Sequence, residues 1–125
     1  MIGYVTLGTN KIEQAAHFYD ELFALLGAKR AMQNERFIAW GTSPEAPMVC
    51  IIKPFDGKAA TPGNGNMTAL YIADKTQIPA LHAKALALGG SDEGAPGDRG
   101  DGFYAGYFRD LDGNKLAVFH TGRGG

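Results

Sequence analysis

Disulfide-forming cysteine pairs, a sizeable net charge and long apolar runs are all missing from this sequence. Cys50 is the single cysteine, which excludes an intrachain disulfide and is typical of a reducing compartment. The formal net charge of -1 gives no basic surface to attract nucleic acid or an anionic membrane. No apolar run reaches the roughly 20 residues of a membrane span, and the first residues lack the basic and apolar regions of a signal peptide. We therefore expect a cytoplasmic protein without nucleic-acid or membrane partners.

What is present is enough for one globular domain over residues 1–125. Hydrophobic residues make up 45% of the chain and charged residues 20%, so a chain of this length can bury a core. The hydrophobic pattern divides the domain into two similar modules, the first at about residues 1–57 and the second at about residues 64–121. A Pro- and Gly-rich segment connects them.

The first module is predicted to contain a strand, a helix and three further strands. Asn10, with Glu13 three residues later, is a typical helix start. Apolar residues then recur at helical spacing until Gly27, a plausible helix stop. The predicted strands span residues 2–9, 28–33, 36–40 and 48–53.

The second module repeats this order. Thr76 and Pro79 mark the start of its helix, because proline is tolerated in a first helical turn. Asp112-Gly113-Asn114 is the strongest hairpin signal in the chain, since these residues accept the positive φ of tight turns. The predicted strands span residues 65–73, a short stretch near residue 92, and the hairpin arms 103–109 and 115–120.

This repeat predicts an α+β fold made of two βαβββ modules. A unit of this length cannot bury its sheet alone. We expect the modules to form a curved mixed sheet with both helices on the outer face, which leaves a concave cleft on the other face.

Six segments together resemble one known family. They are Tyr4-Val-Thr-Leu-Gly8, Ala16-His-Phe-Tyr-Asp20, Lys53-Pro-Phe-Asp-Gly57, Gly63-Asn-Gly65, Asp92-Glu-Gly-Ala-Pro96 and the closing hairpin. The chain resembles the glyoxalase/bleomycin resistance/extradiol dioxygenase proteins, the vicinal oxygen chelate superfamily. The resemblance implies the two-module fold and a homodimer. It does not specify a reaction, because this family includes lyases, dioxygenases, epimerases and non-catalytic binders.

The resemblance also implies where a divalent metal would be held. The ligands of the family, typically His or Gln, Glu, His and Glu, match Tyr4, Cys50, Met67 and Ala117 here. Such a metal needs imidazole and carboxylate ligands, so this set does not suit it. His17 and His82 lie on the predicted helices and His120 at the end of the last strand, so none replaces them. We expect no metal and no other cofactor.

The cleft is predicted to be mostly apolar with a few hydroxyl groups. Tyr4 either orients a ligand or fills space, and Cys50 is either a nucleophile or a small buried residue. Trp40 and Tyr104 either stack on a flat ligand or belong to the core. The predicted lining is Tyr4, Thr6, Trp40, Cys50, Met67, Ala69, Tyr104, Ala117 and Phe119.

Two functions fit this pattern. The first is a module that binds a small apolar or aromatic molecule in a metal-free cleft. The alternative is a metal-dependent lyase or dioxygenase-type enzyme acting on a small oxygen-rich substrate, which needs ligands that the matching positions do not supply. An enzyme that uses Tyr4 or Tyr104 as an acid without a metal is a further variant of the second hypothesis.

Overall fold

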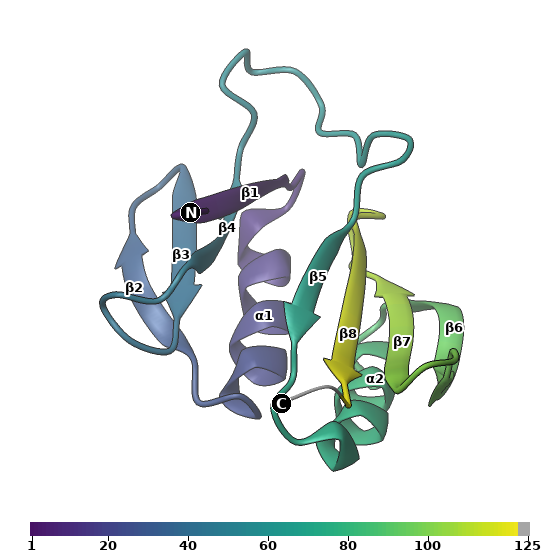
Figure 1. Cartoon of the computed structure of the whole chain (residues 1–125). Coiled ribbons are helices and arrows are strands. Elements are labelled where there is room, and N and C mark those ends of the chain that lie inside the picture. Colours follow the sequence, from purple (N-terminus) through teal and green to yellow (C-terminus); the bar gives the residue numbers. More distant parts are fainter. Residues whose placement is uncertain (123–125) are drawn as a thin grey trace.

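The computed structural model describes residues 1–122, and its elements follow the predicted repeat (Figure 1). In the first module, β1 (Tyr4–Gly8) is followed by α1 (Ile12–Ala24), β2 (Lys29–Gln33), β3 (Phe37–Gly41) and β4 (Met48–Ile52). In the second module, β5 (Thr68–Tyr71) leads into a short 3-10 helix, η1 (Lys75–Gln77), and α2 (Ile78–Ala87). The last strands are β6 (Ser91–Asp98), β7 (Phe103–Arg109) and β8 (Lys115–Thr121).

The strands form two mixed sheets of four strands each. Their orders are β1-β4-β3-β2 and β5-β8-β7-β6, and β1 and β5 pair parallel with β4 and β8 while the other pairs are antiparallel. The predicted α+β class with two βαβββ modules is confirmed. The hydrogen bonds divide the strands into two sheets, so the continuous curved sheet expected from the repeat is not formed by backbone pairing within one chain.

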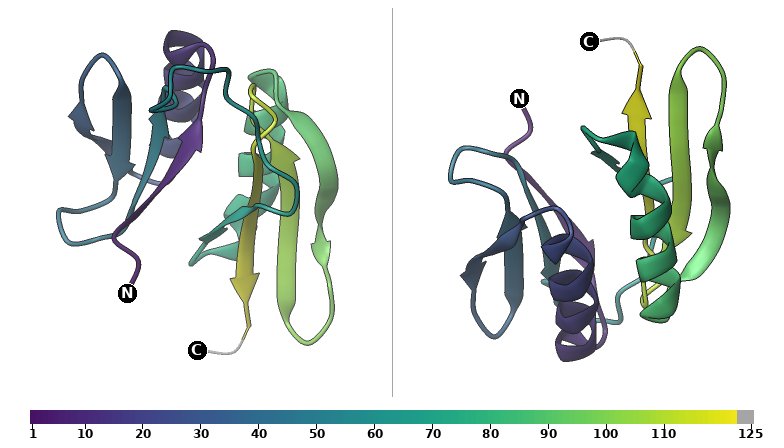
Figure 2. Two further views of the ribbon diagram at one scale, coloured as in Figure 1. Left: turned by 90° about the horizontal axis from the view of Figure 1, so that it is seen from above. Right: turned by 90° about the horizontal axis from the view of Figure 1, so that it is seen from below.

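Both helices lie between the two sheets (Figure 2). Their apolar stripes merge into one core that includes Phe18 and Leu22 of α1 and Leu81 of α2. The same core contains Trp40 from the first sheet and Phe108 from the second, and the Phe18 and Phe108 rings are 6.5 Å apart. Lys84 and Glu21 link α2 to α1 at 3.5 Å. In a single chain, the surfaces of the sheets that face away from the helices therefore point outward.

The structure corrects the predicted cap of the first helix. Lys11 is the N-cap residue of α1 and its side chain makes no capping bond, whereas Thr9 Oγ1 accepts a hydrogen bond from Lys11 N. The Asn10 side chain instead binds both backbone groups of Ala60, accepting from its N–H at 2.7 Å and donating to its carbonyl at 3.2 Å. Asn10 therefore holds the segment between the modules.

The second helix and the sixth strand also differ in detail. Asp74, not Thr76, is the N-cap residue of η1, and its carboxylate accepts from the N–H and the hydroxyl of Thr76. Pro79 lies in the first turn of α2 as expected. Strand β6 is eight residues long, longer than the short strand predicted near residue 92. None of the helices in the described residues is long and apolar enough to cross a membrane.

A buried polar cluster joins the two modules. The Tyr19 hydroxyl of α1 donates to Asp110 Oδ2 at 2.6 Å, across 91 residues of sequence. Asp110 also accepts from the N–H groups of Asp112 and Asn114, both at 2.9 Å, and from Asn114 Nδ2 at 3.0 Å. Asn114 Nδ2 in turn donates to the Gly8 carbonyl at the end of β1. The closing hairpin is thereby fixed to both α1 and β1.

This cluster predicts a specific loss of stability at alkaline pH. Burial raises the pKa of Tyr19 well above its ordinary value, and the Asp110 carboxylate raises it further. A folded-state pKa above the unfolded value of about 10 favours the neutral phenol, so its stabilisation is complete below pH 10 and is lost as the pH rises toward the folded-state pKa. Urea unfolding between pH 9 and about 11.5 should show a steeper fall in the wild type than in Tyr19→Phe. Parallel curves for the two proteins would contradict this assignment.

Candidate functional site

The outward surface of the first sheet is a shallow apolar depression. Because Ile38, Trp40 and Ile51 point into the core, their strand neighbours point to the other side. A depression of about 290 Å³ is lined there by residues of β1, β3 and β4, with Met32 and Arg36 at its rim. We call the following set outer face 1: Tyr4, Thr6, Phe37, Ala39, Met48, Cys50 and Ile52.

Cys50 lies at the centre of outer face 1, between Thr6 and Ala39 in neighbouring strands. Only 3% of the residue is exposed, and burial raises the pKa of its thiol. A thiol that is buried and neutral is a poor nucleophile. Of the two roles that the sequence left open for Cys50, this environment favours the small buried residue.

The outward surface of the second sheet is aromatic. Leu116, Val118 and Phe108 point into the core, so the alternate residues of β7 and β8 face outward. The Phe119 ring contacts Tyr71 at a centroid distance of 5.6 Å and Phe103 at 5.5 Å. We call the following set outer face 2: Ala69, Tyr71, Phe103, Ala105, Tyr107, Ala117 and Phe119.

The predicted lining is therefore divided over several surfaces of the chain. Tyr4, Thr6 and Cys50 belong to outer face 1, whereas Ala69, Ala117 and Phe119 belong to outer face 2. The two helices separate these faces within one chain. Met67 lies just before β5 and is exposed. A cleft that contains both predicted groups cannot be formed by one chain in this conformation.

The structure corrects the predicted lining at Trp40 and Tyr104. Both residues were placed in the cleft, but both lie on the helix side of their strands. Trp40 is 2% exposed and packs against Tyr19 and Phe23, with ring centroids 5.7 and 5.9 Å away. Tyr104 packs against the same core next to Lys75. The alternative that they are core aromatics is the one observed. Strand parity decides this, since residues two apart share a face and Trp40 follows Ile38.

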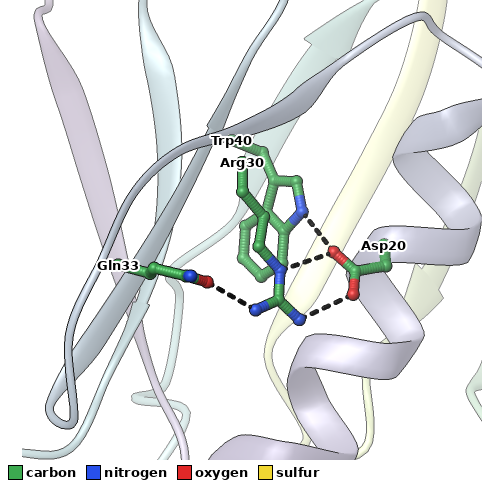
Figure 3. Close-up of polar contacts among 4 residues, drawn as sticks. All are labelled: Asp20, Arg30, Gln33 and Trp40. Atoms are coloured by element: carbon green, nitrogen blue, oxygen red, sulfur yellow. Dashed lines mark hydrogen bonds and ion pairs between the residues drawn. The ribbon is translucent and has the colours of Figure 1, made fainter.

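A polar network holds Trp40 in this orientation (Figure 3). The indole Nε1 donates to Asp20 Oδ1 at 2.9 Å. Arg30 binds both oxygens of Asp20, at 2.9 and 2.7 Å, and donates to Gln33 Oε1 at 2.7 Å. The hydrogen bonds from Arg30 hold the pKa of Asp20 below its usual value. Asp20 and Arg30 are each more than a third exposed, so we interpret the network as a structural clamp of α1, β2 and β3 and not as a reactive centre.

Three predicted residues also line a groove between the modules. Trp40, Met67 and Ala69 contribute to an apolar groove of about 540 Å³ that runs between the first sheet, the end of α1 and β5. Its walls are helix-side residues such as Val5 and Phe23, together with both faces of β5. Met48 belongs both to this groove and to outer face 1, so the groove is a second apolar surface that adjoins outer face 1.

Equivalent backbone bonds show which residues of the two modules correspond. Thr9 N donates to the Ile52 carbonyl at 3.0 Å just beyond β1, and Ile72 N donates to the Phe119 carbonyl at 2.7 Å just beyond β5. Ile52 therefore corresponds to Phe119, and the residues two positions earlier, Cys50 and Ala117, also correspond. Each of them pairs with an equivalent residue of the neighbouring parallel strand, Thr6 with Cys50 and Ala69 with Ala117. The positions matched from sequence therefore lie at corresponding, outward-facing places in the two modules.

The side chains at these positions do not fit a divalent metal. Tyr4, Cys50, Met67 and Ala117 include neither a carboxylate nor an imidazole. No three His, Cys, Asp or Glu side chains within residues 1–122 are close enough together to hold an ion.

The three histidines are placed elsewhere in the fold. His17 is an exposed residue of α1. His82 of α2 is buried beside Asp92 and the Tyr107 carbonyl, at 3.0 and 3.2 Å from its Nε2. Nδ1 of His120 is 2.8 Å from the Ile72 carbonyl, and the imidazole ring stacks on Tyr71.

Comparison with known proteins identifies the family. The family described as Glyoxalase/Bleomycin resistance protein/Dioxygenase superfamily matches residues 1–118. This chain belongs to that superfamily. The resemblance seen in the sequence is thereby confirmed, and the two-module fold is the one that other superfamily proteins have.

Several solved structures share this fold over nearly the whole chain. A glyoxalase/bleomycin resistance protein from Albidiferax ferrireducens T118 is 36% identical, with 96% of this chain and 98% of that chain covered and a TM-score of 0.88. A glyoxalase-related enzyme from Fulvimarina pelagi is 22% identical, with 96% and 87% covered and a TM-score of 0.77. A lactoylglutathione lyase from Agrobacterium tumefaciens is 18% identical, with 96% and 92% covered and a TM-score of 0.71, which shows the superfamily fold alone. No curated protein matches the sequence.

Proposed function

We propose that this superfamily member binds a small, largely apolar or aromatic molecule in a metal-free cleft. Outer face 1 of one chain and outer face 2 of a second copy would enclose this cleft, so the homodimer would be the binding form. The observation that carries the proposal is the composition of the two faces. At their matching central positions they present Cys50 and Ala117, surrounded by Tyr, Phe, Met, Ile and Ala side chains.

Exposure of these faces supports a second copy as the missing wall. Tyr4 is 62% exposed and Tyr71 is 56% exposed, and Met32 at the rim of outer face 1 is also exposed. Exposed apolar side chains that lie together, as Tyr4 and Met32 do at the depression of outer face 1, are typical of an interaction site. A pocket for a small molecule usually buries most of the ligand, which one open sheet face cannot do. A homodimer with two equivalent clefts satisfies both requirements.

Binding of a neutral fluorescent probe tests this proposal. N-phenyl-1-naphthylamine should bind with one molecule per cleft, and light scattering should give twice the chain mass of 13.3 kDa. Tyr4→Arg should weaken probe binding by about tenfold or more, because the charge would have to be desolvated in the cleft. Ala83→Arg, on the exposed side of α2, is the matched control and should leave binding unchanged.

A third variant separates the cleft from the groove between the modules. Thr42 lines the groove but not outer face 1, and it is exposed. Thr42→Arg should therefore leave probe binding intact. If Thr42→Arg abolished binding while Tyr4→Arg did not, the groove would be the binding site and the proposed cleft would be wrong.

The metal-dependent alternative is tested on the same purified protein. Elemental mass spectrometry before and after incubation with Zn, Ni, Mn and Fe(II), combined with thermal unfolding, should detect no stoichiometric metal and no thermal shift. A bound metal that raises the melting temperature would favour a lyase or dioxygenase-type enzyme and would contradict the role assigned to Tyr4, Met67 and Ala117.

A further inference from the structure

A polar cavity lies next to outer face 1, below the segment that connects the modules. Its volume is about 290 Å³, and its polar lining residues are Thr6, Thr61, Asn66, Thr68, Asn114 and Lys115. Thr6 belongs both to this cavity and to the depression of outer face 1. The cavity and the depression of outer face 1 therefore adjoin at the Thr6 side chain.

Lys115 is the charged residue of this lining, and no carboxylate in residues 1–122 lies within salt-bridge distance of it. Its ammonium group lies over the Tyr107 ring, 5.5 Å from the centroid. The nearest carboxylates in sequence are used elsewhere. Asp112 accepts from Asn10 N at 2.9 Å, and Asp110 is surrounded by the buried donors described above. Lys115 thus lines the cavity with its ammonium group directed toward β7, and the side chain would rotate about its flexible bonds to meet an anion in the cavity.

Hydrogen-bond donors accompany this charge. The hydroxyl groups of Thr6, Thr61 and Thr68 form no hydrogen bond with another residue in the described part of the chain. Each hydroxyl can therefore donate to a ligand oxygen. A lysine and three hydroxyl donors lining one cavity of this size favour a small anionic group, because charge-assisted hydrogen bonds are stronger than neutral ones.

We infer that this cavity binds the carboxylate end of an otherwise apolar ligand, with Lys115 as its counter-ion. The inference rests on the proposed function and names the ligand class, an apolar or aromatic monocarboxylic acid. One ammonium group neutralises one negative charge, so a carboxylate fits better than a doubly charged phosphate. The anion-binding cavity belongs to one chain, whereas the apolar cleft requires two.

Titration with matched probes tests the inference. In ¹H–¹⁵N NMR spectra at constant ionic strength, benzoate should bind the wild type on the order of tenfold more tightly than benzamide, which has the same ring without the charge. Benzoate should also shift the backbone amide signals of Thr68 and Lys115. Lys115→Gln should remove the preference for benzoate, and Thr68→Val should reduce it. Lys29→Gln, on the exposed strand β2, should preserve it.

Each outcome is decisive. The inference would be overturned by equal affinities for benzoate and benzamide, or by a benzoate preference that survives Lys115→Gln. The proposed apolar cleft would still stand in that case if both probes shift the signals of Tyr4 and Cys50. Cavity shifts by benzoate without any shift on the outer faces would support the anion site and contradict the proposed cleft. Tighter binding of phenyl phosphate than of benzoate would replace the carboxylate with a phosphate. Absence of binding by all three probes would overturn both proposals.

Discussion

Replacing Asp110 with alanine is expected to lower the free energy of unfolding by about 3 kcal/mol or more. Asp110 is 6% exposed and accepts hydrogen bonds from Tyr19, Asp112 and Asn114. Alanine would leave four donor groups facing a small apolar side chain. Each unsatisfied buried donor costs about 1–3 kcal/mol, although relaxation and water entry would recover part of this cost. The loss is concentrated where the hairpin, α1 and β1 meet.

Urea unfolding at pH 7 measures this effect directly. Asp98→Ala is the matched control, since Asp98 is exposed and its carboxylate accepts one local hydrogen bond, from Gly100 N at 2.6 Å. That variant should lose less than about 1 kcal/mol. A loss at Asp110 no larger than at Asp98 would show that the hydrogen bonds to Asp110 do not hold the modules together.

Trp40→Ala is the second substitution with a large expected effect. Trp40 is among the largest fully buried side chains of the protein, so its removal should create a cavity and cost about 3–5 kcal/mol. Part of this cost comes from the aromatic contacts with Tyr19 and Phe23, and part from the indole hydrogen bond to Asp20. Trp40→Phe should cost less, because it keeps most of the apolar contact while losing the N–H donor.

Tyr4→Ala is the matched control for Trp40→Ala. Comparing the two losses of stability tests which side of the sheet each residue occupies. Tyr4 was predicted to line the same cleft as Trp40, yet it is 62% exposed in the single chain. Thermal and urea unfolding at low protein concentration, where a dimer would dissociate, should show a loss of under about 1 kcal/mol for Tyr4→Ala. Comparable losses for the two variants would mean that Trp40 is not a core residue or that Tyr4 is one.

The sequence alone determined most of the local structure of this protein. The hairpin around Asp112-Gly113-Asn114 was predicted because its turn chemistry is local. Ala117 and Phe119 were predicted to share the cleft side of the last strand, and they do lie together on the side away from the core, because side chains in a strand alternate with a period of two. The sequence also showed directly that the four matching positions carry neither a carboxylate nor an imidazole, because this depends only on which residues stand there.

Three features depended on tertiary structure. Phe37-Ile-Ala-Trp40 is apolar on both sides, so its sequence contained no signal for which side faces the helices, and Trp40 was placed in the cleft. Asn10 has the features of a helix cap, but a distant backbone at Ala60 competes for its side chain. The cluster of Tyr19, Asp110 and Asn114 depends on a hydrogen bond between residues 91 positions apart, Tyr19 and Asp110, which no local pattern reports.

The arrangement of the two modules was the main feature that the sequence pattern did not predict and that the tertiary structure determined. Both helices have apolar stripes that must be buried. In a repeat of two modules, the helices can pack on the outer face of one shared sheet, or they can pack against each other between two sheets. In this chain they pack against each other and share one core with both sheets. That choice turns outer face 1 and outer face 2 away from one another, because a helix layer now separates them. The sequence therefore determined the order of the strands and helices in each module, whereas the packing of the helices decided that one chain does not bring the two faces together.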